Sequence, residues 1–112
     1  MSKNYMTLFL GGMERGLKFN FGTLRFLGEI TDSDPLKFAG SGNPSDQFKF
    51  VKSIVHAALL SNYLSLKKQP DFTDAEVTDW VSDLGMEDAT KVTQAFTLAF
   101  SVEAPGTADT QQ

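Results

Sequence analysis

The sequence predicts an α+β fold: a mostly helical single domain with a short N-terminal β-hairpin packed on about four helices. Three observations predict this class. Short segments of β-forming residues flank Gly11 and Gly12, apolar residues recur with helical spacing through residues 45–68, and residues 73–76 form a helix-capping sequence. A lone hairpin is marginal in water, so we expect it to pack on the helices.

Length and composition limit the classes of function that the chain can have. The chain has 112 residues, a net charge of −4 and a pI near 4.8, and we expect one domain over residues 1–101 and a disordered polar tail over residues 102–112. The acidic balance argues against non-specific nucleic-acid binding, which depends on Lys and Arg. The lack of Cys excludes disulfides and thiolate catalysis and fits a reducing cytoplasm. With no recognisable signal peptide or membrane span, a soluble intracellular protein is expected.

The hairpin is predicted at the N-terminus. Residues 5–10 are apolar and rich in β-formers, and the Gly-Gly pair after them easily adopts the positive φ of a two-residue turn. Residues 14–19 then alternate, which places Leu17 and Phe19 on the same side of the second strand.

A first helix is predicted from an N-cap at Asn20 to about Thr31. The residues at i, i+3 spacing are expected to face inward, namely Phe21, Leu24, Leu27 and Ile30 or Thr31. An Asp-Ser-Asp-Pro sequence ends this helix, and a short helical turn is expected at residues 35–39.

The long helix over residues 45–68 is expected to begin at an N-cap on Ser45 and to end with Lys67 and Lys68 before Pro70. It has two apolar faces, the first with Phe48, Val51, Val55, Ala58, Leu59 and Leu66, and the second with Phe50, Ile54, Ala57 and Leu64. Such a helix is either central in the fold or partly covered by another chain.

His56 is the single histidine and lies on the polar stripe of this helix, beside several lysines. A general base or a metal ligand is one reading of it. A solvated or hydrogen-bonded side chain is the favoured reading, because no second ligand or nucleophile is spaced to act with it.

The next helix has the clearest signals. Thr73 and Glu76 form a capping box, and Gly85 is expected to end the helix as its C′ residue. The inward stripe is Val77, Trp80, Val81 and Leu84. The nearby carboxylates are assigned to the first helical turn and the solvent face rather than to catalysis or metal binding; they are Asp71, Asp74, Glu76, Asp79 and Asp83.

A final helix is predicted over residues 86–101. Its inner face is Ala89, Val92, Phe96, Ala99 and Phe100, and a second, smaller apolar strip is Ala95, Leu98 and Val102. We hypothesise a partner-binding surface from the apolar residues left over once one face of each helix is assigned to the core. These residues are Ala95, Leu98 and Val102, together with Phe50, Ile54 and Leu64. No catalytic, cofactor-binding or metal-binding constellation is expected.

The order of these segments resembles the tail assembly chaperone family of long-tailed bacteriophages and prophages. A hairpin leads into Leu-Lys-Phe-Asn-Phe at residues 17–21, an apolar helix carries Val-His-Ala-Ala-Leu-Leu at residues 55–60, and Phe-Thr-Asp-Ala-Glu-Val at residues 72–77 leads into Asp-Trp-Val. The resemblance spans about residues 7–100, through loose motifs that are mainly fold signals. The Gly-rich link before the long helix and the phenylalanines of the last helix are less typical of the family.

The resemblance implies a non-enzymatic protein that binds the tape measure protein, a very long helical protein with exposed apolar stripes. Binding would keep that partner soluble and support assembly of the tail tube around it. The resemblance leaves two points open: whether the major tail protein is a further partner, and whether the chain associates with itself. It also implies action in the cytoplasm of the bacterial host and absence from the mature virion.

Two non-enzymatic alternatives stay open. One is a small phage structural protein of the head–tail connector type, which stable ring formation by the chain alone would favour. The other is a regulatory binding module of the host. An enzyme is the third class, and it would need a nucleophile, a base or a metal site.

Overall fold

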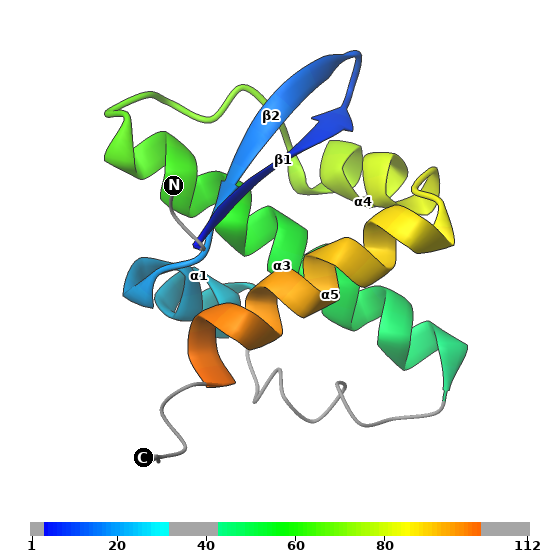
Figure 1. Ribbon diagram of the computed structural model, residues 1–112. Helices are drawn as coiled ribbons and strands as arrows, with labels where there is room; N and C mark the ends of the chain where they lie inside the picture. Colours follow the sequence, from blue (N-terminus) through cyan, green and yellow to red (C-terminus); the bar gives the residue numbers. More distant parts are fainter. Residues whose placement is uncertain (1–3, 32–42, 102–112) are drawn as a thin grey trace, which may run out of the picture.

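Helix α3 lies at the centre of the computed structural model, which describes residues 4–31 and 43–101 (Figure 1). The elements in chain order are β1 (Tyr5–Leu10), β2 (Met13–Lys18), α1 (Phe21–Thr31), α3 (Pro44–Ser65), α4 (Asp74–Ser82) and α5 (Met86–Ser101). The prediction of an α+β fold with an N-terminal hairpin on helices is confirmed. The short turn expected at residues 35–39 and the tail expected at residues 102–112 lie outside the described residues.

The strands β1 and β2 form an antiparallel two-stranded sheet joined by a tight turn. Gly11 and Gly12 have φ values of 63° and 86°, the positive values that this turn was expected to need. The second strand is one residue out of the predicted range at each end. The inner face of the hairpin supplies Leu8, Leu10 and Leu17 to the core.

Helix α1 begins as expected after Asn20, whose Oδ1 accepts a hydrogen bond of 3.1 Å from the N–H of Thr23. The Thr23 hydroxyl in turn accepts from the N–H of Asn20 at 2.9 Å and donates to the carbonyl of Lys18. Thr23 and Leu27 of this helix are fully buried. The prediction that Phe21 faces inward is wrong: its side chain is 86% exposed, because Thr23 takes the inward position of the first turn.

Both ends of α3 differ from the prediction. Asn43, not Ser45, is the N-cap, and its side chain accepts 2.8 Å from the N–H of Ser45. Pro44 takes the first helical position, where a missing N–H has no cost. The helix ends at Ser65 because Lys67 adopts a left-handed φ of 61°, which closes a Schellman-type C-cap.

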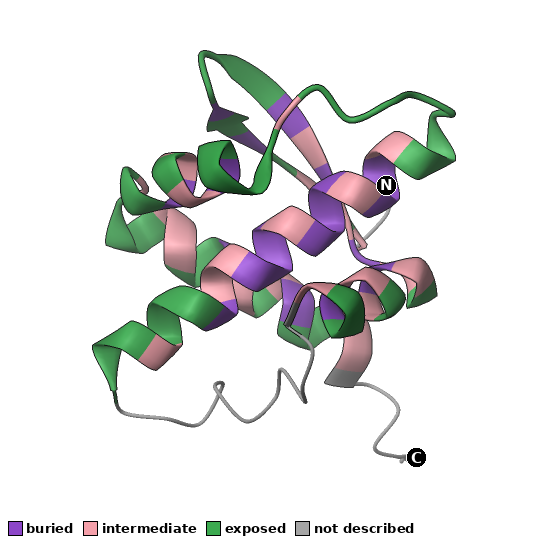
Figure 2. Cartoon of the chain, turned by 180° about the vertical axis from the view of Figure 1, so that it is seen from behind, coloured by how far each residue is buried: buried purple, intermediate pink, exposed green. Residues whose placement is uncertain are grey.

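The middle of α3 is covered on both apolar faces, so the helix is central in the fold (Figure 2). Its buried apolar residues come from both predicted faces and are Phe50, Ile54, Val55, Ala57, Ala58 and Leu59. β2 and α1 pack along the helix, and α4 and α5 contact it too. The exposed large apolar residues lie toward its two ends: Phe48 near the start, Leu64 in the last turn and Leu66 at the C-cap.

The predicted capping box of α4 is present, with the Thr73 side chain and the Glu76 carboxylate each accepting from the other residue's N–H. Gly85 is not the C′ residue expected, because α4 ends at Ser82 with Asp83 as its C-cap. Helix α5 has the predicted bounds.

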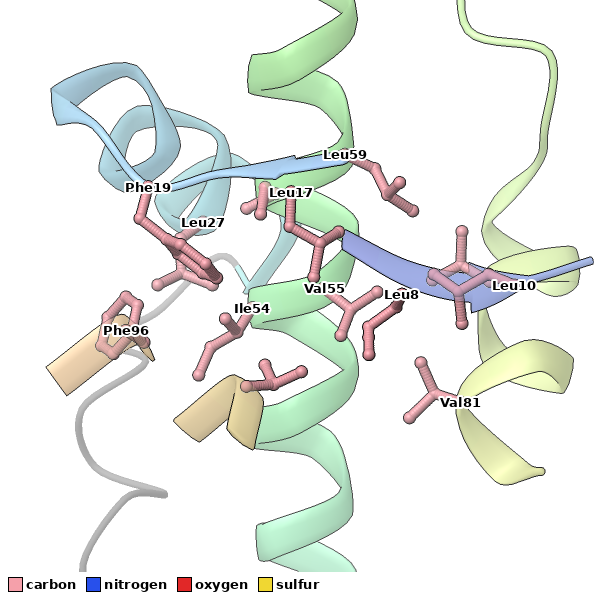
Figure 3. Close-up of a cluster of buried hydrophobic side chains, with 14 of the residues drawn as sticks. Leu8, Leu10, Leu17, Phe19, Leu27, Ile54, Val55, Leu59, Val81 and Phe96 are labelled. Atoms are coloured by element: carbon pink, nitrogen blue, oxygen red, sulfur yellow. The ribbon is translucent and has the colours of Figure 1, made fainter. Parts of the chain in front are cut away.

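Aromatic contacts fix α5 on the rest of the molecule. Phe96 is 5% exposed and contacts the rings of Phe19, Phe50 and Phe100 at centroid distances of 6.4, 5.7 and 5.0 Å. The first two contacts are edge-to-face, the arrangement that aromatic rings prefer. Phe19, Phe50 and Phe96 belong to the buried cluster that includes the inner face of the hairpin and α3, and Phe100 packs against it. Figure 3 shows Phe19 and Phe96 in this cluster.

Candidate functional site

A groove with a volume of about 740 Å³ lies between the first half of α3, the end of α4 and the first part of α5. Its apolar lining includes Phe48, Phe50, Val51, Leu84, Met86 and Phe96. Uncharged polar residues complete the lining, among them Gln47, Ser82, Thr90, Thr93, Gln94 and Thr97.

Local structure explains how these residues come together. The N-cap on Asn43 sets where α3 begins and so places Phe48 and Val51 in its first two turns. The turn between α4 and α5 is short, and it brings Leu84 and Met86 to the same groove. Met86 is 81% exposed, whereas Phe96 closes the floor of the groove from the core side.

The chemistry of the groove is that of a binding surface. None of its lining residues carries a charge or titrates near neutral pH, so nothing in the lining would attract an ionic ligand. Apolar side chains flanked by Thr and Gln suit an apolar surface with a few hydrogen-bonding groups at its edge. The volume falls within the range of about 300–1,000 Å³ found for ligand sites.

The structure corrects two of the six predicted contact residues. Phe50 and Ile54 are 6% and 0% exposed, so the expectation that they lie on a free apolar strip is wrong. At these two positions the second face of α3 is covered within the chain, and the Phe50 ring packs at 90° to that of Phe96 on α5. Phe50 reaches the groove only through its small accessible area.

The other predicted contact residues have different positions. Leu64 and Leu98 are 58% and 59% exposed, as a contact surface requires, but neither lines the groove. Ala95 is partly buried and packs against the core cluster. Val102 lies outside the described residues.

Sequence reasoning missed the groove residues because helical periodicity assigned them to the core. Phe48 and Val51 share the first apolar face of α3, and Leu84 belongs to the inward stripe of α4. Their position along the helices could have identified them. They lie near helix ends, where fewer neighbouring helices or strands pack over an apolar side chain. Met86, an apolar residue at the first position of α5, was the plainest such case.

A buried arginine fixes the hairpin to the loop after α3. Arg15 is 7% exposed; its Nε donates to the carbonyl of Leu10 at 3.0 Å, and one terminal nitrogen donates to Asp71 and to the Tyr63 hydroxyl at 2.9 Å each. The guanidinium also lies 4.5 Å from the ring centroid of Trp80. Hydrogen bonds from Arg15 and Tyr63 lower the pKa of Asp71. Each polar group of this cluster has a hydrogen-bond partner, so we interpret the cluster as structural: it holds the hairpin against the loop after α3.

His56 faces a second polar cluster. Its side chain is 12% exposed, and Nδ1 lies 3.3 Å from Oδ1 of Asp74, a distance that permits an ion pair but without the geometry of a hydrogen bond. Lys52 donates to the same Asp74 oxygen and so lowers the pKa of that carboxyl. Burial, and secondly the nearby Lys52 charge, lower the pKa of His56. The expectation of a solvated or hydrogen-bonded histidine is therefore not met at Nδ1, which is buried beside the Asp74 carboxylate without a hydrogen bond.

Within residues 4–31 and 43–101, no group of three or more His, Asp or Glu side chains is arranged to hold a metal ion. In the same part of the chain, no helix is long and apolar enough to cross a membrane. Three of the acidic residues near α4 have structural partners: Asp71 binds Arg15, Asp74 binds Lys52, and Glu76 completes the cap. Asp79 and Asp83 are exposed, as expected for the solvent face. The comparison of the chain with protein-family models, curated proteins and solved structures finds no match.

Proposed function

We propose that this protein is a tail assembly chaperone of a long-tailed bacteriophage or prophage, which binds the tape measure protein and keeps it soluble during tail tube assembly. The single structural observation that supports the proposal is the uncharged apolar groove between α3, α4 and α5. The resemblance of residues 7–100 to that family supplies the partner. On this proposal the protein acts in the host cytoplasm and is absent from the finished virion.

The groove suits one recognition mode in particular. An amphipathic helix binds such a groove by inserting apolar side chains at i, i+3, i+4 and i+7 spacing. Met86 and Phe48 offer exposed apolar surface at the groove, and the Thr and Gln residues of its lining can bond to the polar edge of a bound helix. A long helical partner with apolar stripes presents many such segments in series.

The test is co-expression of this chain with the tape measure protein that the neighbouring long gene is expected to encode. We expect the long protein to become soluble and to co-purify with this chain. If the long protein is indifferent and this chain forms a defined ring alone, the connector-type alternative replaces the chaperone.

Two matched variants locate the binding surface. Met86→Asp introduces a charge into the groove at the first turn of α5, where a carboxylate favours the helix, so the protein should stay folded. Leu98→Asp introduces the same charge on an exposed residue of the same helix outside the groove. The groove proposal requires that Met86→Asp loses the solubilising effect and Leu98→Asp keeps it. The reverse result would move the contact to the strip that the sequence suggested.

A further inference from the structure

The strand β1 has one unpaired edge. It pairs with β2 on one side only, and no third strand continues the sheet in the described part of the chain. β2 is the strand that packs along α3, whereas β1 contacts α5. The backbone groups along that edge of β1 are therefore placed to accept another strand.

The backbone direction of each β1 residue follows from the hairpin register. The N–H of Phe19 donates to the carbonyl of Asn4 at 2.7 Å, and Leu10 and Met13 flank the two-residue turn. Hence the even-numbered residues of β1 direct their N–H and C=O groups at β2. The odd-numbered residues, which are Tyr5, Thr7 and Phe9, direct theirs at the free edge.

The same odd-numbered residues place their side chains on the outer face of the sheet. Phe9 is 71% exposed and Tyr5 is 44% exposed, an unusual amount of aromatic surface for so short a strand. The Tyr5 ring and the Asn62 side chain of α3 both lie next to Gly16 of β2, where a Cβ would come 2.9 Å from Tyr5 Cε1 and 2.8 Å from Asn62 Nδ2. A third strand beside β1 would find a flat aromatic surface already formed.

The edge also lacks the usual protection. Natural edge strands carry charged residues, proline or bulges that prevent unwanted pairing. β1 reads Tyr-Met-Thr-Leu-Phe-Leu and has none of these, whereas β2 carries Glu14, Arg15 and Lys18. An unprotected edge next to a charged strand indicates that the β1 edge itself is used for pairing.

We propose that β1 pairs antiparallel with β1 of a second copy of this chain, around a two-fold axis at Thr7. This register is self-complementary: Thr7 meets Thr7, and Tyr5 meets Phe9 of the second copy. All three residues direct their backbone groups at the free edge, so each opposed pair exchanges both of its hydrogen bonds. The aromatic residues then meet across the strands on the outer face, a favourable cross-strand pairing. The product is a four-stranded sheet in a closed dimer, which two-fold symmetry stops from growing into a ring.

The absence of Cys makes the register testable by single-cysteine crosslinking. Opposed residues of a hydrogen-bonded antiparallel pair have Cα atoms about 5.5 Å apart, within the range that a disulfide spans. Thr7→Cys should therefore form a disulfide-linked dimer under mild oxidation. Tyr5→Cys alone and Phe9→Cys alone should form no disulfide-linked dimer on the same timescale, and the two should crosslink when mixed. Failure of Thr7→Cys to crosslink, or equal crosslinking by all three single variants, would overturn the register.

Sedimentation velocity of Thr7→Pro and Thr7→Ala tests the edge independently of any crosslink. Proline removes the Thr7 N–H, which β2 does not use, and proline is tolerated on edge strands. Both variants lose the Thr7 hydroxyl bond to Glu14, so they are matched in that respect. Thr7→Pro should raise the dimer dissociation constant roughly 10- to 100-fold over Thr7→Ala, with both far-UV spectra unchanged. A wild-type chain that sediments as a monomer at every concentration, or equal dimerisation by both variants, would refute the proposal.

Discussion

Replacing Gly11 by Ala should cost far more stability than replacing Gly12 by Ala, although both glycines form the same turn. Both have positive φ, which costs a residue with a side chain about 1–2 kcal/mol. A smaller gain of about 0.4–1 kcal/mol comes from the less flexible unfolded chain. A Cβ on Gly12 meets nothing within 4 Å, so Gly12→Ala should cost about 1 kcal/mol in total.

A Cβ on Gly11 would lie 2.5, 2.6 and 2.8 Å from three atoms of the Trp80 indole, so the ring must move. Overpacking of this kind costs about 1–3 kcal/mol. The displaced indole also loses contact with Arg15, 4.5 Å from its centroid, and with Phe72, whose ring centroid is 6.0 Å away. Together with the net backbone cost of about 1 kcal/mol, Gly11→Ala should cost about 2–4 kcal/mol, a large share of a typical domain stability of about 5–15 kcal/mol.

Urea unfolding followed by circular dichroism measures both free energies. The variants should differ by about 1–3 kcal/mol, and in a Trp80→Leu background the two penalties should converge. If Gly11→Ala and Gly12→Ala lose the same stability, the turn does not rest on Trp80 and the packing of the hairpin against α4 is misjudged.

Three further predictions concern single side chains. Phe96→Ala should lower the free energy of unfolding by about 3–5 kcal/mol in urea titrations, because it removes the ring that joins α5 to Phe19 and Phe50, and a loss below about 1 kcal/mol would contradict this packing. Lys67→Gly should raise the melting temperature by a few degrees, about 1 kcal/mol, since glycine adopts the φ of 61° without strain, while Lys68→Gly should not. The pKa of His56 is lowered from 6.5 in the folded state, so the unfolded chain takes up its proton first and stability should fall as pH drops below about 6.5. His56→Gln should remove this loss between about pH 7 and pH 5, and an unchanged slope would assign it to other groups.

Short-range sequence patterns predicted most of the fold. The paired glycines, the Asn20 cap and the Thr73–Glu76 capping box each depend on neighbours within a few residues, and each is where the sequence placed it. The errors fall where two local solutions compete. Asn43 followed by Pro44 outweighs Ser45 as a start, and Lys67 adopts a left-handed conformation that is usually left to glycine.

The candidate site was much harder to predict, because the packing of all the elements decides which apolar side chains are buried. Periodicity shows that α3 has two apolar faces but not which elements pack on each. Thus Phe50 and Ile54 look spare in the sequence and are core in the structure, whereas Phe48, which periodicity placed on the first apolar face of α3, is 36% exposed. No pattern within one helix identifies a groove whose walls come from three.

The position of the hairpin has a consequence for the order of folding. Strands β1 and β2 are synthesised first, yet Arg15 finds its carboxylate 56 residues later, at Asp71, and Gly11 packs on Trp80 of α4. A two-stranded hairpin is marginal until such partners exist. On the ribosome the first strands must therefore wait until α4 has emerged. In the finished protein, the amide hydrogens shared by β1 and β2 should exchange with solvent only when the whole domain opens.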